Sequence, residues 1–185
     1  LIIHTETATG ITNDLPAIRS AIDSADHPGL LIVDTVAAVG TVDYRMDEWG
    51  IDVTVGASQK GLMMPPGIGI VAAGEKALSA TKESTMPRLY WDWKTRLEAE
   101  HYRKFCGTAP QLMVFGMREA LNMLFEEGLE NVFERHKVLA GATQAAVAAN
   151  VTMAELKGAV QKVLQLRAAE IRQFLDKKLG TEREG

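Results

Sequence analysis

The first part of the chain alternates between short apolar runs and one amphipathic stretch. Four apolar runs have the length of strands: residues 1–3, 30–33, 51–55 and 68–73. After the first run, Leu15, Ile18 and Ile22 recur at the spacing of one helix face, and Asn13 is the expected N-cap. A continuous apolar run such as residues 30–33 is typical of a parallel strand buried on both faces. The pattern predicts an α/β fold with a mainly parallel, doubly wound sheet.

The second part of the chain becomes helical. Residues 75–108 are irregular and carry an aromatic cluster between Tyr90 and Trp93. From residue 111 onward, apolar positions at helical spacing predict one helix that Gly128 ends and a second over residues 129–149. A third helical pattern covers residues 156–175. We therefore expect a domain boundary near residue 110.

Composition excludes several classes of protein. The chain has 185 residues, 46% of them hydrophobic and 24% charged, with a net charge of −4 and no basic block, so we expect no nucleic-acid partner. No apolar run is long enough to span a membrane and no signal peptide is visible. The single cysteine, Cys106, has no partner for an internal disulfide, which fits the cytoplasm or an organelle. The apolar start at Leu1 indicates part of a longer protein.

Polar residues follow three of the predicted strands. Thr7, Asp34 and Lys60 each lie just past the end of an apolar run. In open α/β sheets, ligands bind in the crevice at the carboxyl ends of the strands. We therefore expect these three residues to face one ligand.

A lysine and an aspartate at such an edge suit pyridoxal phosphate chemistry. The lysine of such an enzyme holds the cofactor aldehyde as a Schiff base, and a carboxylate keeps the pyridine nitrogen protonated. At about 4 Å and an effective dielectric of about 20, the carboxylate stabilises the pyridinium by roughly 4 kcal/mol. Alternatives remain for both residues. Lys60 is also explained as a solvated surface lysine, and Asp34 as a helix N-cap or a Mg²⁺ ligand of a phosphatase- or NTPase-like sheet, although no P-loop accompanies it.

Neighbouring residues can complete a cofactor site or have ordinary structural roles. Ser58 and Gln59 precede the lysine on an expected turn, where they either bind a phosphate or simply form the turn. Thr7 either donates to the ring oxygen or caps its loop, as does Thr9. Val36 packs against the ring face, against the core, or against both.

Several runs of the sequence together resemble the class V pyridoxal phosphate-dependent aminotransferases, particularly the serine–glyoxylate and alanine–glyoxylate aminotransferases. The Ser-Gln-Lys run followed by Pro-Pro-Gly, at its spacing from Asp34, is the most specific of them. The resemblance extends over about residues 2–149, and the matching runs are residues 4–10, 33–37, 46–52, 56–67, 107–110 and 118–130.

The resemblance implies a fold-type I transferase and a role for each matched residue. Lys60 forms the Schiff base with pyridoxal 5′-phosphate and moves the proton between the substrate Cα and C4′. Asp34 binds the pyridine nitrogen, Thr7 contacts the ring oxygen and Val36 lies against the ring. Residues 1–110 become part of the large cofactor-binding domain, and residues 111–185 a helical connection with part of a smaller C-terminal domain.

The phosphate contacts implied by the resemblance need a dimer. Gln59 reaches the phosphate of its own subunit. Thr108 contacts the phosphate of the neighbouring subunit's cofactor, so a homodimer is expected. Phe105 stands where some relatives carry a phosphate-binding tyrosine, and no such role is assigned to it.

The reaction implied is a transamination from serine or alanine to glyoxylate or a related 2-oxo acid. The alternative is a truncated cofactor-binding or assembly remnant without activity, because two family features are missing. The early segment with a phosphate loop and a ring-stacking aromatic is not found, and Arg167 and Arg172 read as helix-face charges rather than as the substrate-carboxylate arginine. A desulfurase is disfavoured because Cys106 does not lie in a late mobile loop.

Overall fold

A computed structural model describes residues 1–98, 100, 104–105, 107–149, 155, 158, 161–162 and 165. The chain divides into two compact units, Leu1–His136 and Lys137–Gly185. Cys106, Arg167, Arg172 and most of the helix predicted for residues 156–175 lie outside the described residues. The functional division near residue 110 stays a prediction. No helix in the described part of the chain is both long and apolar enough to cross a membrane.

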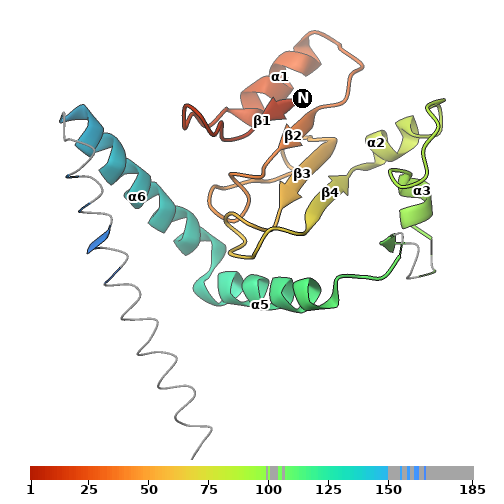
Figure 1. Ribbon diagram of the computed structural model, residues 1–185. Coiled ribbons are helices and arrows are strands. Elements are labelled where there is room, and N and C mark those ends of the chain that lie inside the picture. Colours follow the sequence, from red (N-terminus) through yellow and green to blue (C-terminus); the bar gives the residue numbers. More distant parts are fainter. Residues whose placement is uncertain are drawn as a thin grey trace, which may run out of the picture. The chain divides into compact units, whose positions relative to one another are not determined.

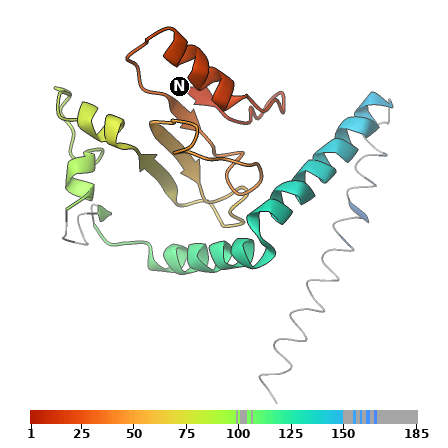
Figure 2. The same ribbon diagram turned by 180° about the vertical axis from the view of Figure 1, so that it is seen from behind.

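The first unit contains a four-stranded sheet of order β1-β2-β3-β4 (Figure 1). Its strands are β1 (Ile2–Ile3), β2 (Ile32–Asp34), β3 (Val53–Ala57) and β4 (Gly69–Ala73). The first three strands are parallel, and β4 runs antiparallel to β3 (the reverse side is seen in Figure 2). Each predicted strand is therefore present, with its start displaced by one or two residues.

The direction of β4 follows from its connection to β3. Residues 58–68 join the two strands and contain turns but no helix. A parallel neighbour needs a crossover connection of a dozen or more residues, usually a helix, whereas a short loop returns the chain antiparallel. The sheet remains mainly parallel, as predicted, and the predicted α/β class is confirmed.

Helix α1 (Leu15–Ser24) begins one residue later than predicted. Its N-cap is Asp14, whose side-chain Oδ1 accepts a hydrogen bond from the Ala17 N–H at 2.9 Å. Asn13, the expected cap, instead donates from Nδ2 to the Ile3 carbonyl at 2.7 Å. Its backbone N–H also donates to the His4 carbonyl. The prediction for Asn13 was wrong because its side chain already holds the loop against β1.

Two hydrophobic clusters stabilise this unit. In the first, Leu15 of α1 packs with Leu31, Val33 and Ile51 around β2. The second joins the β3–β4 connection to α5 (Gln111–Glu127) and to the start of α6 (Leu129–Ala148), through the buried residues Leu62, Leu124 and Val132. Burying each such aliphatic side chain contributes about 1.5–3 kcal/mol.

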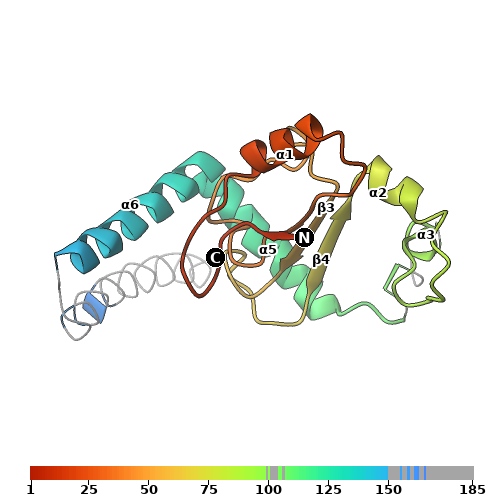
Figure 3. The ribbon, with the colours of Figure 1, turned by 90° about the horizontal axis from the view of Figure 1, so that it is seen from above.

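Gly128 separates these two helices as predicted. Its φ is 85°, in the left-handed region that favours glycine, and its N–H donates to the Leu124 carbonyl. Helix α5 passes below the connection that joins β3 to β4, as seen in Figures 1 and 3. The connection between β3 and β4 therefore packs against helices, although it contains no helix itself.

The residue after β1, His4, is buried in an aromatic group. It is 2% exposed, and its ring centroid lies 5.5 Å from that of Tyr44 and 6.1 Å from that of Trp49. Its Nδ1 has no hydrogen-bond partner in the part of the chain that is described. Burial lowers the pKa of His4 from its ordinary 6.5, and the nearby carboxylate of Asp43 opposes this only in part.

This burial predicts an acid-sensitive fold. Because the folded chain binds the His4 proton less readily than the unfolded chain, the stabilisation is fully present above a pH of about 6.5. It is lost as the pH falls from there through the lowered pKa. Replacing His4 with phenylalanine, which keeps a ring against Tyr44 and Trp49, should flatten this pH dependence in denaturant unfolding. His27→Gln, at an exposed histidine, is the control. An unchanged pH dependence in His4→Phe would contradict the role of His4 in acid sensitivity.

Candidate functional site

Lys60 lies in the connection between β3 and β4, three residues past the end of β3. Ser58 and Gln59 form the predicted turn before it. The Lys60 side chain is exposed, and no hydrogen bond or ion pair engages its amine among the described residues. Its carbonyl accepts a hydrogen bond from the Met63 N–H at 2.9 Å, which tightens the turn. The amine is therefore available at the carboxyl edge of the sheet.

Asp34 is the last residue of β2 and lies at the same edge. It pairs with Ile3 of β1 on one side and with Val55 of β3 on the other. Its Oδ1 accepts a hydrogen bond from the Val36 N–H at 2.9 Å, whereas its second carboxylate oxygen has no partner among the described residues. Asp34 is thus a half-buried carboxylate with one oxygen free for a ligand.

Metal binding gains no support at this carboxylate. No three His, Cys, Asp or Glu side chains gather closely enough to hold a metal ion within the described residues. A free amine and a carboxylate with an open oxygen are the groups that a pyridoxal ring needs, one at its aldehyde and one at its nitrogen. The donor set therefore fits that cofactor.

Thr7 lies on the loop that follows β1, which is closed by several hydrogen bonds. The Glu6 carboxylate accepts from the Ala8 N–H at 3.0 Å and from the Thr9 N–H and hydroxyl at 2.7 and 2.8 Å. These hydrogen bonds lower the pKa of the Glu6 carboxyl. Thr9 therefore caps its own loop, whereas the Thr7 hydroxyl is exposed and has no hydrogen-bond partner in the described chain.

Two glycines allow the loop after Asp34 to pack closely against the loop that contains Lys60. A Cβ on Gly61 would lie 2.3 Å from the Val39 carbonyl oxygen and 2.6 Å from Cγ2 of Thr41. Gly40 has a φ of +78°, and a Cβ there would lie 3.1 Å from the Gly61 backbone. Only glycine permits so close a backbone approach. This contact sets the position of Lys60 relative to Asp34.

Adding a methyl group at Gly61 should disrupt this contact. We expect Gly61→Ala to destabilise the protein by about 1–3 kcal/mol, because the new Cβ overlaps backbone atoms that cannot rotate away. Equilibrium unfolding in urea measures the change. Gly69→Ala is the matched control, since a Cβ at Gly69 meets nothing within 4 Å and should change stability by less than about 0.5 kcal/mol. Equal stability of the two variants would contradict the contact.

Helix α5 supports the other side of the lysine loop. The Met64 Cε lies 2.9 Å from the position of a Cβ on Gly116, and the Met113 Cε lies 3.1 Å from that on Gly67. Leu62, two residues after the lysine, is buried in the second hydrophobic cluster. The loop is thus held between α5 and the segment after β2.

The other predicted site residues have different surroundings. Val36 is half-buried in the turn after β2, and Gln59 is exposed beside Lys60. Ser58 is completely buried, with its hydroxyl hydrogen-bonded inside the loop. Thr108 is exposed on the segment that leads into α5, and no hydrogen bond joins it to Lys60 or Asp34 among the described residues. The structure gathers all of these except Thr108 on loops at one sheet edge.

The sequence did not reveal which residues position the site. Asn13, Gly40 and Gly61 hold the three loops in place, through hydrogen bonds and a close backbone contact. A glycine directly after the lysine and another six residues after Asp34 were the visible signals. The sequence does not show what either glycine contacts, because the contact partner of each lies in a different loop between strands.

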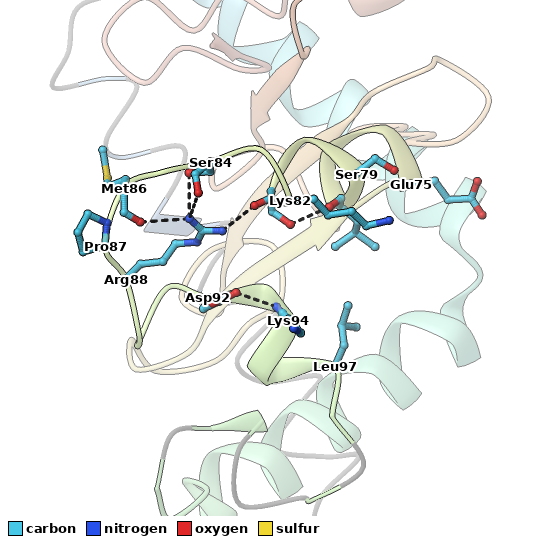
Figure 4. A pocket seen from close by; sticks show the side chains of 12 residues that line it. Glu75, Ser79, Lys82, Ser84, Met86, Pro87, Arg88, Asp92, Lys94 and Leu97 are labelled. Atoms are coloured by element: carbon cyan, nitrogen blue, oxygen red, sulfur yellow. Dashed lines mark hydrogen bonds between the residues drawn. The ribbon is translucent and has the colours of Figure 1, made fainter.

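Three cavities of the first unit are lined by residues other than the predicted site residues. The largest, of about 930 Å³, is lined by α2 (Glu75–Ala80), the loop after it and α3 (Trp93–Arg96), as Figure 4 shows. There Arg88 is committed to the loop, donating to the Thr81 carbonyl at 2.8 Å and to the Ser84 hydroxyl at 2.9 Å. None of the three is lined by Lys60 or Asp34.

Comparison with known proteins identifies the kind of chain to which this geometry belongs. The family model described as aminotransferase class-V matches residues 1–171. A serine–glyoxylate aminotransferase of Methylorubrum extorquens is 45% identical over 154 residues, which is 80% of this chain and 38% of that protein. An L-aspartate–glyoxylate aminotransferase of Paracoccus denitrificans is 42% identical over 147 residues, covering 80% of this chain and 37% of that protein.

A solved structure has the same fold. The alanine–glyoxylate aminotransferase of Nostoc sp. superposes with a TM-score of 0.64 at 31% identity, over 73% of this chain and 37% of that one. The chain therefore spans less than two fifths of the length of each of these relatives. The predicted fold-type I class is confirmed by this match.

Proposed function

The chain belongs to the class-V aminotransferase family, and we propose that it forms the lysine-bearing part of a pyridoxal phosphate-dependent transaminase. The observation that carries the proposal is the free amine of Lys60 at the same sheet edge as the carboxylate of Asp34. The cofactor implied by the family is pyridoxal 5′-phosphate, and it supplies an aldehyde that accepts amino groups and a ring that takes up electrons from the substrate Cα.

Lys60 and Asp34 have the central roles in this proposal. Lys60 would hold the cofactor aldehyde covalently, and its amine, when free, would move the proton at the substrate Cα. Asp34 holds a proton on the ring nitrogen through its open carboxylate oxygen. The hydrogen bond from Val36 to Oδ1 supports this role, because it orients the carboxylate.

The remaining residues orient the cofactor. The free Thr7 hydroxyl donates to the ring oxygen, and Val36 packs against the ring face. Gln59, exposed beside the lysine, binds the phosphate, and Thr108 binds the phosphate of the partner subunit in a homodimer. Thr108 is exposed on the segment before α5, so its hydroxyl is accessible to a second subunit. Ser58 is the exception within the predicted set, because its polar groups are committed inside the loop.

The proposed substrates are small amino acids and 2-oxo acids, with serine or alanine as amino donor and glyoxylate as acceptor. Relatives whose names specify serine, aspartate and alanine all share glyoxylate in those names, which supports the acceptor more strongly than the donor. The cytoplasm, or an organelle, remains the compartment predicted from the sequence.

A donor panel tests the proposal. The full-length protein, loaded with pyridoxal 5′-phosphate, is given glyoxylate with serine, alanine or aspartate, and glycine is measured. We expect glycine with serine or alanine, and none when the cofactor has been removed. Loaded protein that forms no glycine with any of the three donors would contradict the proposed reaction.

A further inference from the structure

Ser58 is the first residue after β3 and the second before Lys60, and it is completely buried. Its hydroxyl donates a hydrogen bond to the Pro65 carbonyl at 2.8 Å and accepts one from the Ile68 N–H at 3.3 Å. Its backbone N–H donates to the Ile68 carbonyl at 3.1 Å, and its carbonyl accepts from the Met64 N–H at 3.0 Å. Both the side chain and the backbone of Ser58 are therefore fully engaged.

These four hydrogen bonds join the two ends of the connection between β3 and β4. Ser58 opens the connection, and its partners Met64, Pro65 and Ile68 close it. Lys60 lies between the joined ends. The path of the backbone at Lys60 therefore depends on the hydroxyl of Ser58 as well as on the contact of Gly61.

A phosphate role for Ser58 conflicts with this arrangement. A serine hydroxyl has one proton to donate, and that of Ser58 goes to the Pro65 carbonyl. Turning it toward a phosphate would leave the Pro65 carbonyl without its partner. The side chain also has no exposed surface through which a phosphate could approach, whereas Gln59 is exposed.

We propose that Ser58 is a positioning residue, which holds the backbone of Lys60 so that the amine reaches the cofactor aldehyde, and that it does not bind the cofactor phosphate. This inference rests on the proposed function of Lys60. Two neighbouring residues thus have different roles, because Gln59 binds the phosphate and Ser58 does not.

Comparing pyridoxal phosphate with pyridoxal, which lacks the phosphate, tests the inference in the full-length protein. The ratio of the two affinities measures the phosphate contacts alone. For Ser58→Ala we expect this ratio to stay within about twofold of that of the unmodified protein, whereas the matched Gln59→Ala variant should lower it about tenfold, the usual effect of losing a hydrogen bond to a charged group. A ratio that falls about tenfold in Ser58→Ala would overturn the inference.

The rate of covalent attachment supplies the second readout. After pyridoxal phosphate has bound, the visible absorbance of the lysine-bound cofactor should develop about tenfold more slowly in Ser58→Ala, because a displaced amine reacts less often. Loss of stability alone would leave this rate unchanged at a temperature at which the variant is folded. An unchanged rate would therefore also overturn the inference.

A second variant keeps the test usable if Ser58→Ala does not fold. Cysteine has nearly the same size as serine and is a weaker donor. In Ser58→Cys the ratio of the two affinities should therefore again stay close to that of the unmodified protein. The attachment rate should lie between those of the unmodified protein and Ser58→Ala. A lowered ratio in this variant would overturn the inference in the same way. Failure of the proposed function is distinct, because the unmodified protein would then attach no cofactor.

Discussion

Replacing Lys60 with alanine is expected to abolish transamination, with a loss on the order of 10³-fold or more. The lysine is assigned both the covalent bond to the cofactor and the proton transfer at the substrate Cα, and positioned acid–base catalysis alone contributes about 10²–10⁴-fold. The visible absorbance of the lysine-bound cofactor should disappear as well. Spectra of the loaded protein and initial rates of glycine formation measure both effects.

Two further variants make this result specific. Lys60→Arg keeps a positive charge but provides no nucleophilic amine, so it should be as inactive as Lys60→Ala. Lys82→Ala removes another exposed lysine of the same unit and should retain full activity. A Lys60→Ala protein with normal transamination would refute the assignment of Lys60.

Replacing Asp34 with asparagine is expected to lower kcat/KM by about 10³-fold. A carboxylate about 4 Å from a pyridinium contributes roughly 4 kcal/mol at an effective dielectric of about 20, and each 1.36 kcal/mol of a barrier corresponds to about tenfold in rate. Asparagine can still accept the hydrogen bond from the Val36 N–H, so the loop should keep its conformation. Steady-state kinetics and thermal unfolding together separate loss of charge from loss of structure.

The control for Asp34 is Asp47→Asn. Asp47 is exposed on the segment after β2, and its substitution removes the same charge without touching the sheet edge. We expect its kinetics to match those of the unmodified protein. Asp34→Asn kinetics within about threefold of this control would contradict the role of the carboxylate at the ring nitrogen.

The local elements of this fold follow directly from the sequence. Each apolar run became a strand, and Gly128 ends α5 because a left-handed residue is needed there. The edge position of Lys60 and Asp34 also follows, since parallel strands end on the same side. The helix start at Asp14 did not follow, because Asn13 and Asp14 are equally good caps until one of them finds another partner.

The long-range contacts of the site were beyond prediction from one sequence. The approach of Gly61 to Val39 depends on the register of β2 against β3, which no local pattern records. The burial of Ser58 depends on the path of the Pro-Pro-Gly segment, which returns the chain to β4. For this reason the residue types of a cofactor site were recognisable, while the division between binding and positioning residues needed the structure.

The most direct test of the role of Lys60 is to find the lysine that carries the cofactor. The full-length protein is loaded with pyridoxal 5′-phosphate, reduced with borohydride to fix the covalent linkage, and digested for peptide mapping by mass spectrometry. We expect a single phosphopyridoxyl group on Lys60, in the peptide that contains Ser58 and Gln59. Modification of another lysine in place of Lys60, or no modified lysine at all, would contradict this role.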